Sequence, residues 1–153
     1  MQQNITWQCA HFSELSAAQL YAILRMRSEV FIVEQNCVYQ DIDGADFDCM
    51  HLIGWASDQQ VAAYMRIVPP GLKFAEVSLG RVITSNAARG TGIGKQLLSK
   101  GMAFIEATYP GQTVRIHAQA YLEKFYLSYG FATASDVMLE DGIAHYVMIK
   151  PSA

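Results

Sequence analysis

The chain has 153 residues, of which 52% are hydrophobic and 16% are charged, and its 11 Lys and Arg against 14 Asp and Glu give a formal net charge of −3. This length and apolar content predict one globular domain over residues 1–153 and exclude a disordered or fibrous chain. A mildly acidic chain without a long basic run lacks the positive surface that binds nucleic-acid phosphates or anionic lipid. We therefore expect neither nucleic acid nor a membrane as a partner.

The N-terminal residues and the cysteines favour a cytoplasmic protein. Residues 1–4 lack the basic and apolar segments of a secretory signal, and no apolar run approaches the roughly 20 residues that span a bilayer. Cys9, Cys37 and Cys49 are odd in number and scattered, which favours reduced, buried thiols over disulfides. A zinc site made of Cys37, Cys49 and His51 would lack a fourth ligand at recognisable spacing, so no metal site is expected.

The first element predicted along the chain is a helix that begins after Ser16 and ends near Val30. Ser16 and Gln19 have the spacing of a capping box, and apolar residues follow at helical intervals. Residues 50–57 and 61–68 have the composition of strands and are separated by a connection of hairpin length. These two runs predict a pair of antiparallel strands.

The second half of the chain alternates strands and helices. We predict strands over residues 76–84 and 113–118, helices over 92–108 and 121–129, and a final pair of strands that turn at 140–142. Together with the hairpin of the first half, this order predicts an α/β fold with a mixed, mostly antiparallel central sheet flanked by helices.

The strand predicted over residues 76–84 leads into a glycine-rich loop that opens a helix. The loop reads Arg89-Gly90-Thr91-Gly92-Ile93-Gly94-Lys95. Its backbone amides and the partial positive charge of the helix N-terminus favour a pyrophosphate ligand, although a tight turn alone can also use such glycines. It is neither a dinucleotide-binding fingerprint, because Lys95 stands at the position of the third glycine, nor a Walker loop, because Gln96 follows the lysine.

A second motif follows the loop and reads Phe125-Tyr126-Leu127-Ser128-Tyr129-Gly130-Phe131. In this order the two motifs resemble the Arg/Gln-x-x-Gly-x-Gly loop and the Phe-Tyr-x-x-x-Gly-Phe helix of the GNAT superfamily of acyl-CoA N-acyltransferases. Residues 24–37, 39–46, 51–54 and 80–82 are similar to the ElaA-type branch of that superfamily. The resemblance covers essentially the whole chain. It implies a GNAT-like fold and transfer of an acetyl group from acetyl-CoA to a primary amine by direct attack in a ternary complex.

The resemblance also implies where coenzyme A would bind. Its pyrophosphate would lie on the amides of residues 89–95, and its pantetheine arm would follow the strand that precedes them. Arg89 and Lys95 would add charge-assisted bonds, or would simply be solvated, and Gln119 stands where many relatives place an asparagine. The implied cofactor-binding residues are Val82, Ile83, Thr84, Arg89, Gly90, Thr91, Gly92, Ile93, Gly94, Lys95, Gln119 and Phe125.

The implied chemistry needs an acid for the departing sulfur and a base for the amine. Tyr126, carried over from the second motif, would donate its phenolic proton to the sulfur; the alternative is a core aromatic residue. Alkyl amines have a pKa near 10.4 and are mostly protonated at neutral pH, so a base must take a proton. Glu76, which opens the strand before the loop, is one candidate base.

The rival for the base is an acidic segment that includes Glu34, Asp41 and Asp43, which could also hold a cationic acceptor or be only a solvated loop. Arg66 and Arg81 lie inside otherwise apolar strands, where an unpaired charge is costly. We therefore predict that both arginines pair with this segment, with Arg81 organising the acceptor pocket. The predicted substrate-binding residues are Glu34, Asp41, Asp43 and Arg81.

Two other functions remain open at this point. The region from Arg27 to Phe31 resembles the N-terminal pattern of acyl-homoserine-lactone synthases, which are acyltransferases of another class. A non-catalytic acyl-CoA-binding module would keep the glycine-rich loop without needing Tyr126. The acceptor is expected to be a small-molecule or peptide amine, and a homodimer is a family-level expectation.

Overall fold

The computed structural model of the protein describes residues 4–57 and 59–152. Residues 1–3, 58 and 153 lie outside the described residues. Three predictions therefore fall partly on residues that are not described. They are the absence of a secretory signal at the N-terminus, the connection over residues 58–60, and the two ends of the domain. No helix in the described part of the chain is long and apolar enough to cross a membrane.

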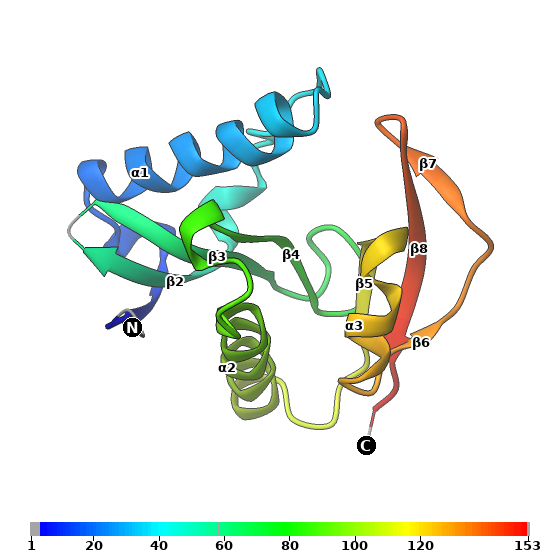
Figure 1. Ribbon diagram of the computed structural model, residues 1–153. Helices are drawn as coiled ribbons and strands as arrows, with labels where there is room; N and C mark the ends of the chain where they lie inside the picture. The colour runs from blue at the N-terminus through cyan, green and yellow to red at the C-terminus, as the bar shows by residue number, and fades with distance from the viewer. Residues whose placement is uncertain (1–3, 58, 153) are drawn as a thin grey trace.

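Two antiparallel sheets form the frame of the structure. The first has the strand order β1 (Thr6–His11), β2 (Met50–Ser57), β3 (Gln60–Val68) and β4 (Ser78–Thr84). In the second, β8 (Ile143–Lys150) lies between β5 (Val114–Gln119) and β6 (Ala132–Thr133) and also pairs with β7 (Met138–Glu140). The sheets meet at a parallel bridge between Val77 and Val114 and separate from there (Figure 1).

Helices cover both faces of the first sheet and one face of the second. They are α1 (Ala17–Arg27), α2 (Ile93–Thr108) and α3 (Glu123–Leu127). Short 3-10 helices are η1 (Phe12–Glu14), η3 (Ala45–Asp48), η4 (Asn86–Ala88) and η5 (Ala120–Leu122), and η2 (Ser28–Glu34) is a π-helical segment that continues α1.

The alternation of side chains along β2 and β3 explains why α1 and α2 lie on opposite faces (Figure 1). Leu52 pairs with Met65, and both belong to the core cluster that contains the buried side of α2. One residue further along β2, Ile53 pairs with Tyr64, and both pack with Ile23 of α1. Because successive strand residues point to opposite faces, each helix covers one of the two sets.

The fold class predicted from the sequence is confirmed, with differences at several boundaries. The capping box is present, because Gln19 N donates to Ser16 Oγ at 3.1 Å and Ser16 N donates to Gln19 Oε1 at 3.0 Å. The helix ends as an α-helix at Arg27 and continues as the π-helical η2 to Glu34. The strand predicted from residue 76 begins at Ser78, and the helix predicted over 121–129 is the shorter α3 preceded by η5.

The cysteine expectation holds for two of the three residues. Cys37 and Cys49 are buried, whereas Cys9 is exposed. Cys9 lies on β1, the edge strand of the first sheet, and alternates there with the buried Ala10. The expectation that Cys9 is buried was therefore wrong, because an edge strand has a covered face and an open one.

Candidate active site

A cavity of about 810 Å³ lies between β4 and β5, where the two sheets separate. Residues 79–84 of β4 and 116–119 of β5 form two of its walls. Because β4 pairs with β3 and β5 with β8, each of the two strands presents a backbone edge to the cavity. An extended ligand can form main-chain hydrogen bonds with edges of this kind.

A β-bulge bends β4 at the cavity. Tyr64 of β3 pairs with Ile83 and Arg66 pairs with Gly80, so β4 carries one residue more than β3 between these pairs. Arg81 lies in this bulge with a φ of 53°, in the left-handed region. Bulges bend a strand and redirect its side chains, which explains how Arg81 reaches the acidic segment from inside a strand.

The glycine-rich loop joins the end of β4 to the N-terminus of α2. Gly90 and Gly92 have φ values of 80° and 83°, and a Cβ at either position would meet no heavy atom within 4 Å. The first turn of a helix has no intrahelical acceptors for its amides. In α2 the first intrahelical hydrogen bond runs from Gln96 N to Gly92 O. The amides of Ile93, Gly94 and Lys95 come before Gln96 in the chain and remain free for an anion.

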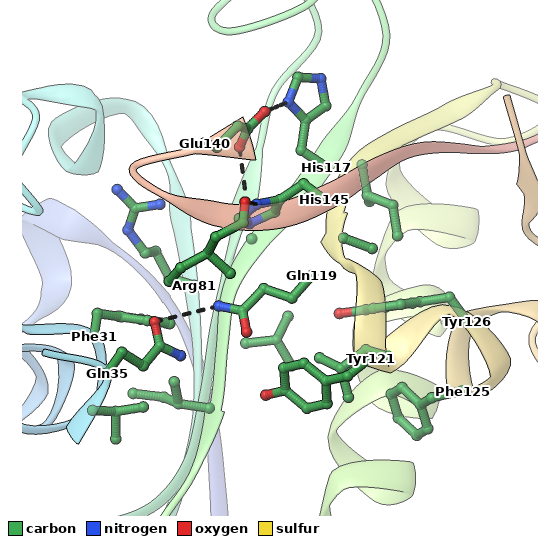
Figure 2. Close-up of a pocket in the computed structure, with 18 of the residues that line it drawn as sticks. Phe31, Gln35, Arg81, His117, Gln119, Tyr121, Phe125, Tyr126, Glu140 and His145 are labelled. Atoms are coloured by element: carbon green, nitrogen blue, oxygen red, sulfur yellow. Dashed lines mark hydrogen bonds and ion pairs between the residues drawn. The ribbon is translucent and has the colours of Figure 1, made fainter. Parts of the chain in front are cut away.

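The predicted cofactor residues gather around this cavity and its adjoining loop. Those that line the cavity are Val82, Ile83, Thr84, Arg89, Gly94, Gln119 and Phe125. Those that belong to the adjoining loop and helix start are Gly90, Thr91, Gly92, Ile93 and Lys95. The Arg89 guanidinium lies against Glu34, with Nη2 2.9 Å from Oε2, and Gln119 Nε2 donates across the cavity to Gln35 Oε1 at 3.4 Å (Figure 2).

Tyr126 of α3 lies on the second-sheet side of the cavity, and Figure 2 shows its hydroxyl pointing toward the interior. The ring is 4% exposed and packs edge-on against Phe131, with ring centroids 5.7 Å apart. Burial raises the pKa of the Tyr126 phenol well above its ordinary value of about 10, so the group is protonated at neutral pH. Its hydroxyl has no hydrogen-bond partner among residues 4–57 and 59–152, which leaves its proton available to a ligand.

Glu76, the sequence-based candidate for the base, does not line the cavity. It precedes the bridge at Val77, and its Oε1 lies 3.9 Å from Nη1 of Arg115 on β5. The structure therefore does not bring Glu76 together with Tyr126.

The acidic segment is held by a network of cations, as predicted for Arg66 and Arg81. Arg66 Nη2 donates to Asp43 Oδ2 at 2.8 Å, and Arg81 Nε donates to Asp41 Oδ1 at 2.6 Å. Arg27 and Lys73 complete the network through Asp46, Asp41 and Asp43. We call these seven residues the ion-pair network: Arg27, Asp41, Asp43, Asp46, Arg66, Lys73 and Arg81.

The ion-pair network changes the role expected of the acidic segment. Its three carboxylates face four cations, so it does not present a negative surface. Asp41 and Asp43 do not line the cavity, whereas Glu34 and Arg81 do. Burial by itself would raise the pKa of Asp43, but hydrogen bonds and charge from Arg66 and Lys73 outweigh it and lower the pKa well below its usual range. Asp41 and Asp43 therefore contact the cavity wall through their ion pairs with Arg81.

Two histidines and a glutamate lie together in the cavity lining and were missed by the sequence analysis. His117 comes from β5, Glu140 from β7 and His145 from β8, and Figure 2 shows Glu140 between the two imidazoles. His117 Nδ1 is hydrogen-bonded to Glu140 Oε1, and His145 Nε2 lies 4.0 Å from Glu140 Oε2. One sequence signal for the site was present in β5, where the polar residues Arg115, His117 and Gln119 alternate with buried residues. No local motif, however, indicates that this strand lies beside β7 and β8.

The separated strands β4 and β5, the glycine-rich loop before α2 and the tyrosine on α3 define an acyl-CoA-dependent acyltransferase fold. The chain belongs to the GNAT acetyltransferase family, since the family described as "Acetyltransferase (GNAT) domain" matches residues 13–151. It is 47% identical to Protein ElaA of Escherichia coli over 148 residues, which are 95% of this chain and 96% of that protein.

Solved structures agree with this assignment. The crystal structure of Escherichia coli ElaA matches with a TM-score of 0.89 at 45% identity and covers 96% of this chain and 99% of that chain. An acyl-CoA N-acyltransferase from Pseudomonas aeruginosa matches with a TM-score of 0.90 at 41% identity, with the same coverage of both chains. A CoA-dependent acyl-homoserine lactone synthase matches with a TM-score of 0.73 at 14% identity, over 95% of this chain and 81% of that chain, which shows a shared fold alone.

Proposed function

We propose that the protein transfers an acetyl group from acetyl-CoA to a primary amine in a ternary complex. The observation that carries this proposal is that one cavity joins three features: two open strand edges, the free amides of the glycine-rich loop and the Tyr126 hydroxyl. The Pseudomonas aeruginosa protein, named an acyl-CoA N-acyltransferase, supports the class of reaction.

The residues at the loop fit the pyrophosphate of coenzyme A. Open space beside Gly90 and Gly92 allows a phosphate to approach the backbone, and the free amides of the first turn of α2 can donate to its oxygens. The Arg89 guanidinium is paired with Glu34 and would leave it to bind a phosphate oxygen of coenzyme A. Such an exchange is favourable because charge-assisted hydrogen bonds to phosphate are strong. Residues 82–84 would then pair with the pantetheine arm through the open edge of β4.

Acetyl-CoA supplies the thioester, whose C–S bond breaks as the amine nitrogen forms the C–N bond. Tyr126 donates its phenolic proton to the departing sulfur, since burial keeps the phenol protonated at neutral pH. The backbone edges of β4 and β5 can orient the reacting groups through main-chain hydrogen bonds. Glu76 lies outside the cavity lining and beside Arg115, so it is not placed to act as the base.

The acceptor amine would enter the part of the cavity away from the glycine-rich loop. Arg81 contributes to this wall and is held from behind by Asp41, so it has a fixed position. Glu34 lies near the loop through its pair with Arg89. These contacts support Arg81 as an organiser of the acceptor pocket and assign Asp41 and Asp43 the task of holding it.

A thiol-release assay with a panel of primary amines tests the proposed function. The panel contains alkyl amines, diamines, free amino acids, peptides and S-adenosylmethionine, which is present in the acyl-homoserine lactone synthase structure. Amine-dependent release of CoA, with the acetylated amine found by mass spectrometry, is the expected result. Tight CoA binding without release from any amine would favour a non-catalytic acyl-CoA-binding module, and release with S-adenosylmethionine and longer acyl-CoA alone would favour the synthase alternative.

A further inference from the structure

A carboxylate oxygen and an imidazole nitrogen face each other in the cavity lining, with no donor from the described residues between them. Glu140 Oε2 lies 4.0 Å from His145 Nε2, and neither atom has a hydrogen bond to any residue that the structure describes. Figure 2 shows both side chains on the wall formed by the β7 to β8 turn. Two facing polar atoms of this kind can bind one ligand that donates hydrogen bonds to both.

The tautomer of His145 follows from its other nitrogen. His145 Nδ1 lies 2.7 Å from the carbonyl oxygen of Ile143, and a carbonyl oxygen can only accept a hydrogen bond. Nδ1 therefore carries the hydrogen. In the neutral imidazole, Nε2 presents its lone pair to Glu140, so it is an acceptor and a base.

Glu140 has one oxygen occupied and one free. His117 Nδ1 is hydrogen-bonded to Oε1, and since a carboxylate only accepts, this nitrogen carries a hydrogen. His117 Nε2 is buried and has no partner among the described residues, so a second charged N–H there would be unsatisfied. Through its Nδ1 hydrogen bond His117 holds Glu140 in place and leaves Oε2 open to the cavity.

An alkylammonium group fits the gap between the two acceptors. Hydrogen bonds of this type have donor to acceptor distances of about 2.7–3.2 Å, so one nitrogen can reach two acceptors that lie 4.0 Å apart. We infer that Glu140 and His145 bind the ammonium group of the acceptor and that His145 Nε2 takes its proton. This inference rests on the proposed function and names the base that function needs.

The proton balance of the transfer uses both sides of the cavity. The ammonium group donates one proton to His145 Nε2, and the lone pair released on nitrogen attacks the thioester carbonyl carbon. The C–N bond forms, the C–S bond breaks, and the sulfur takes the proton of Tyr126. The second proton lost by the nitrogen restores the Tyr126 phenol, and the proton on His145 passes to solvent when the products leave.

Charged groups around His145 come from several elements. Glu140 on β7 faces its imidazole directly, and His117 on β5 lies on the other side of Glu140. The other titratable side chains in the same lining are Glu34, Tyr39, Arg81, Arg89, Tyr121, Tyr126 and Asp141. The Glu140 carboxylate stabilises the imidazolium that forms when His145 takes the proton.

Turnover with two amines of different basicity tests the role of His145. The His145→Gln variant removes the base but keeps a polar side chain, and His11→Gln changes a histidine outside the cavity as the matched control. With a primary alkyl amine at pH 7, His145→Gln should lose 100-fold or more, the usual contribution of a general base. With hydroxylamine, which is largely uncharged at that pH, the loss should be below 10-fold. Equal losses with both amines, or no loss with the alkyl amine, would overturn the inference.

The roles of Glu140 and His117 are separated by the pH profile of the same reaction. Glu140→Gln should raise the KM for the alkyl amine about 10-fold or more, because it removes the carboxylate that binds the ammonium group. His117→Leu should shift the pH midpoint of kcat/KM, and His117→Gln, whose amide can still donate to Glu140, should restore most of it. A merely structural His117 would change the amount of folded protein without moving the midpoint.

Labelling with bromoacetyl-CoA tests the geometry without any acceptor. The reagent places an electrophilic methylene where the acetyl methyl would lie, so His145 Nε2 should form a C–N bond to it as bromide leaves. Peptide mass spectrometry should find the label on His145, and His145→Gln should abolish it. Calorimetric binding of CoA without a label on His145 would overturn the inference alone, whereas absence of CoA binding would overturn the proposed function.

Discussion

Arg27 and Asp46 form a buried ion pair, in which Nη1 of the arginine lies 2.7 Å from Oδ1 of the aspartate. Arg27 is the last residue of α1 and is fully buried, with 0% of its surface exposed. Its Nε also donates to Asp41 at 2.9 Å, and Asp41 in turn accepts from Arg81. The end of α1 is thereby connected through two carboxylates to the β4 bulge at the wall of the cavity.

Arg27→Met should destabilise the fold because it leaves Asp41 and Asp46 buried with fewer cations. Breaking a buried pair by removing one partner typically costs about 3–5 kcal/mol. Urea unfolding at pH 7 measures the effect. The control is Arg25→Met, which changes an arginine whose side chain is 71% exposed in its pair with Glu29 and should cost below about 1 kcal/mol. Equal costs for the two variants would contradict the role given to the ion-pair network.

Acid should destabilise the protein through the carboxylates of this network. Burial by itself would raise the pKa of Asp46, but its hydrogen bond to Arg27 and the charges of Arg27 and Arg66 outweigh it and lower the pKa, as Arg66 and Lys73 do for Asp43. In the unfolded chain these groups return to about 3.9. Below roughly pH 5 the unfolded state therefore binds more protons than the native state, and the stability present above that pH is lost progressively.

The midpoint of thermal unfolding between pH 7 and pH 3 measures this loss. Burial also lowers the pKa of His51, which adds a decline that starts near the ordinary histidine value of about 6.5. The contribution of Asp43 is isolated by Asp43→Asn, which should be less stable than the wild type at pH 7 and should lose less on acidification. An identical pH dependence for the two proteins would show that Asp43 does not carry the effect.

Tyr126→Phe should separate catalysis from binding. The substitution removes only the hydroxyl and keeps the ring against Phe125 and Phe131, so acetyl-CoA binding measured by calorimetry should stay within about twofold. Loss of a general acid typically costs 100-fold or more in kcat. Tyr21→Phe is the matched control, because Tyr21 is exposed on α1 and lies outside the cavity lining. Unchanged turnover in Tyr126→Phe would remove the acid assignment.

Local patterns predicted much of the fold. The capping box at Ser16, the helix that follows the glycine-rich loop and the turn at residues 140–142 depend on neighbours in sequence, and all three are present. Asp141 and Gly142 in that turn have φ values of 52° and 78°, as a tight hairpin between twisted strands requires. The β1 strand was missed, although Ile5, Trp7 and Cys9 alternate with polar residues as in a strand.

The cavity was harder to predict because its walls come from distant parts of the chain. The pairing of Arg66 and Arg81 with the acidic segment followed from the cost of an unpaired buried charge and is confirmed. Glu76, by contrast, lies outside the cavity lining because it precedes the bridge between Val77 and Val114. The position of that bridge depends on how the two sheets pair, which the local sequence does not specify. His145 and Glu140 come together only through the pairing of β7 with β8, which no local motif specifies.

Binding of acetyl-CoA measured by isothermal titration calorimetry tests the central claim most directly. Gly94 lines the cavity at the start of α2, and a Cβ there would only contact Thr84 Cγ2 at 3.8 Å, so substitutions need not strain the backbone. The wild type should bind acetyl-CoA and CoA, and Gly94→Glu should bind at least 10-fold more weakly than its neutral counterpart Gly94→Gln, because it adds a negative charge beside the pyrophosphate. Absence of binding to the wild type, or equal affinity of the two variants, would contradict the placement of coenzyme A in this cavity.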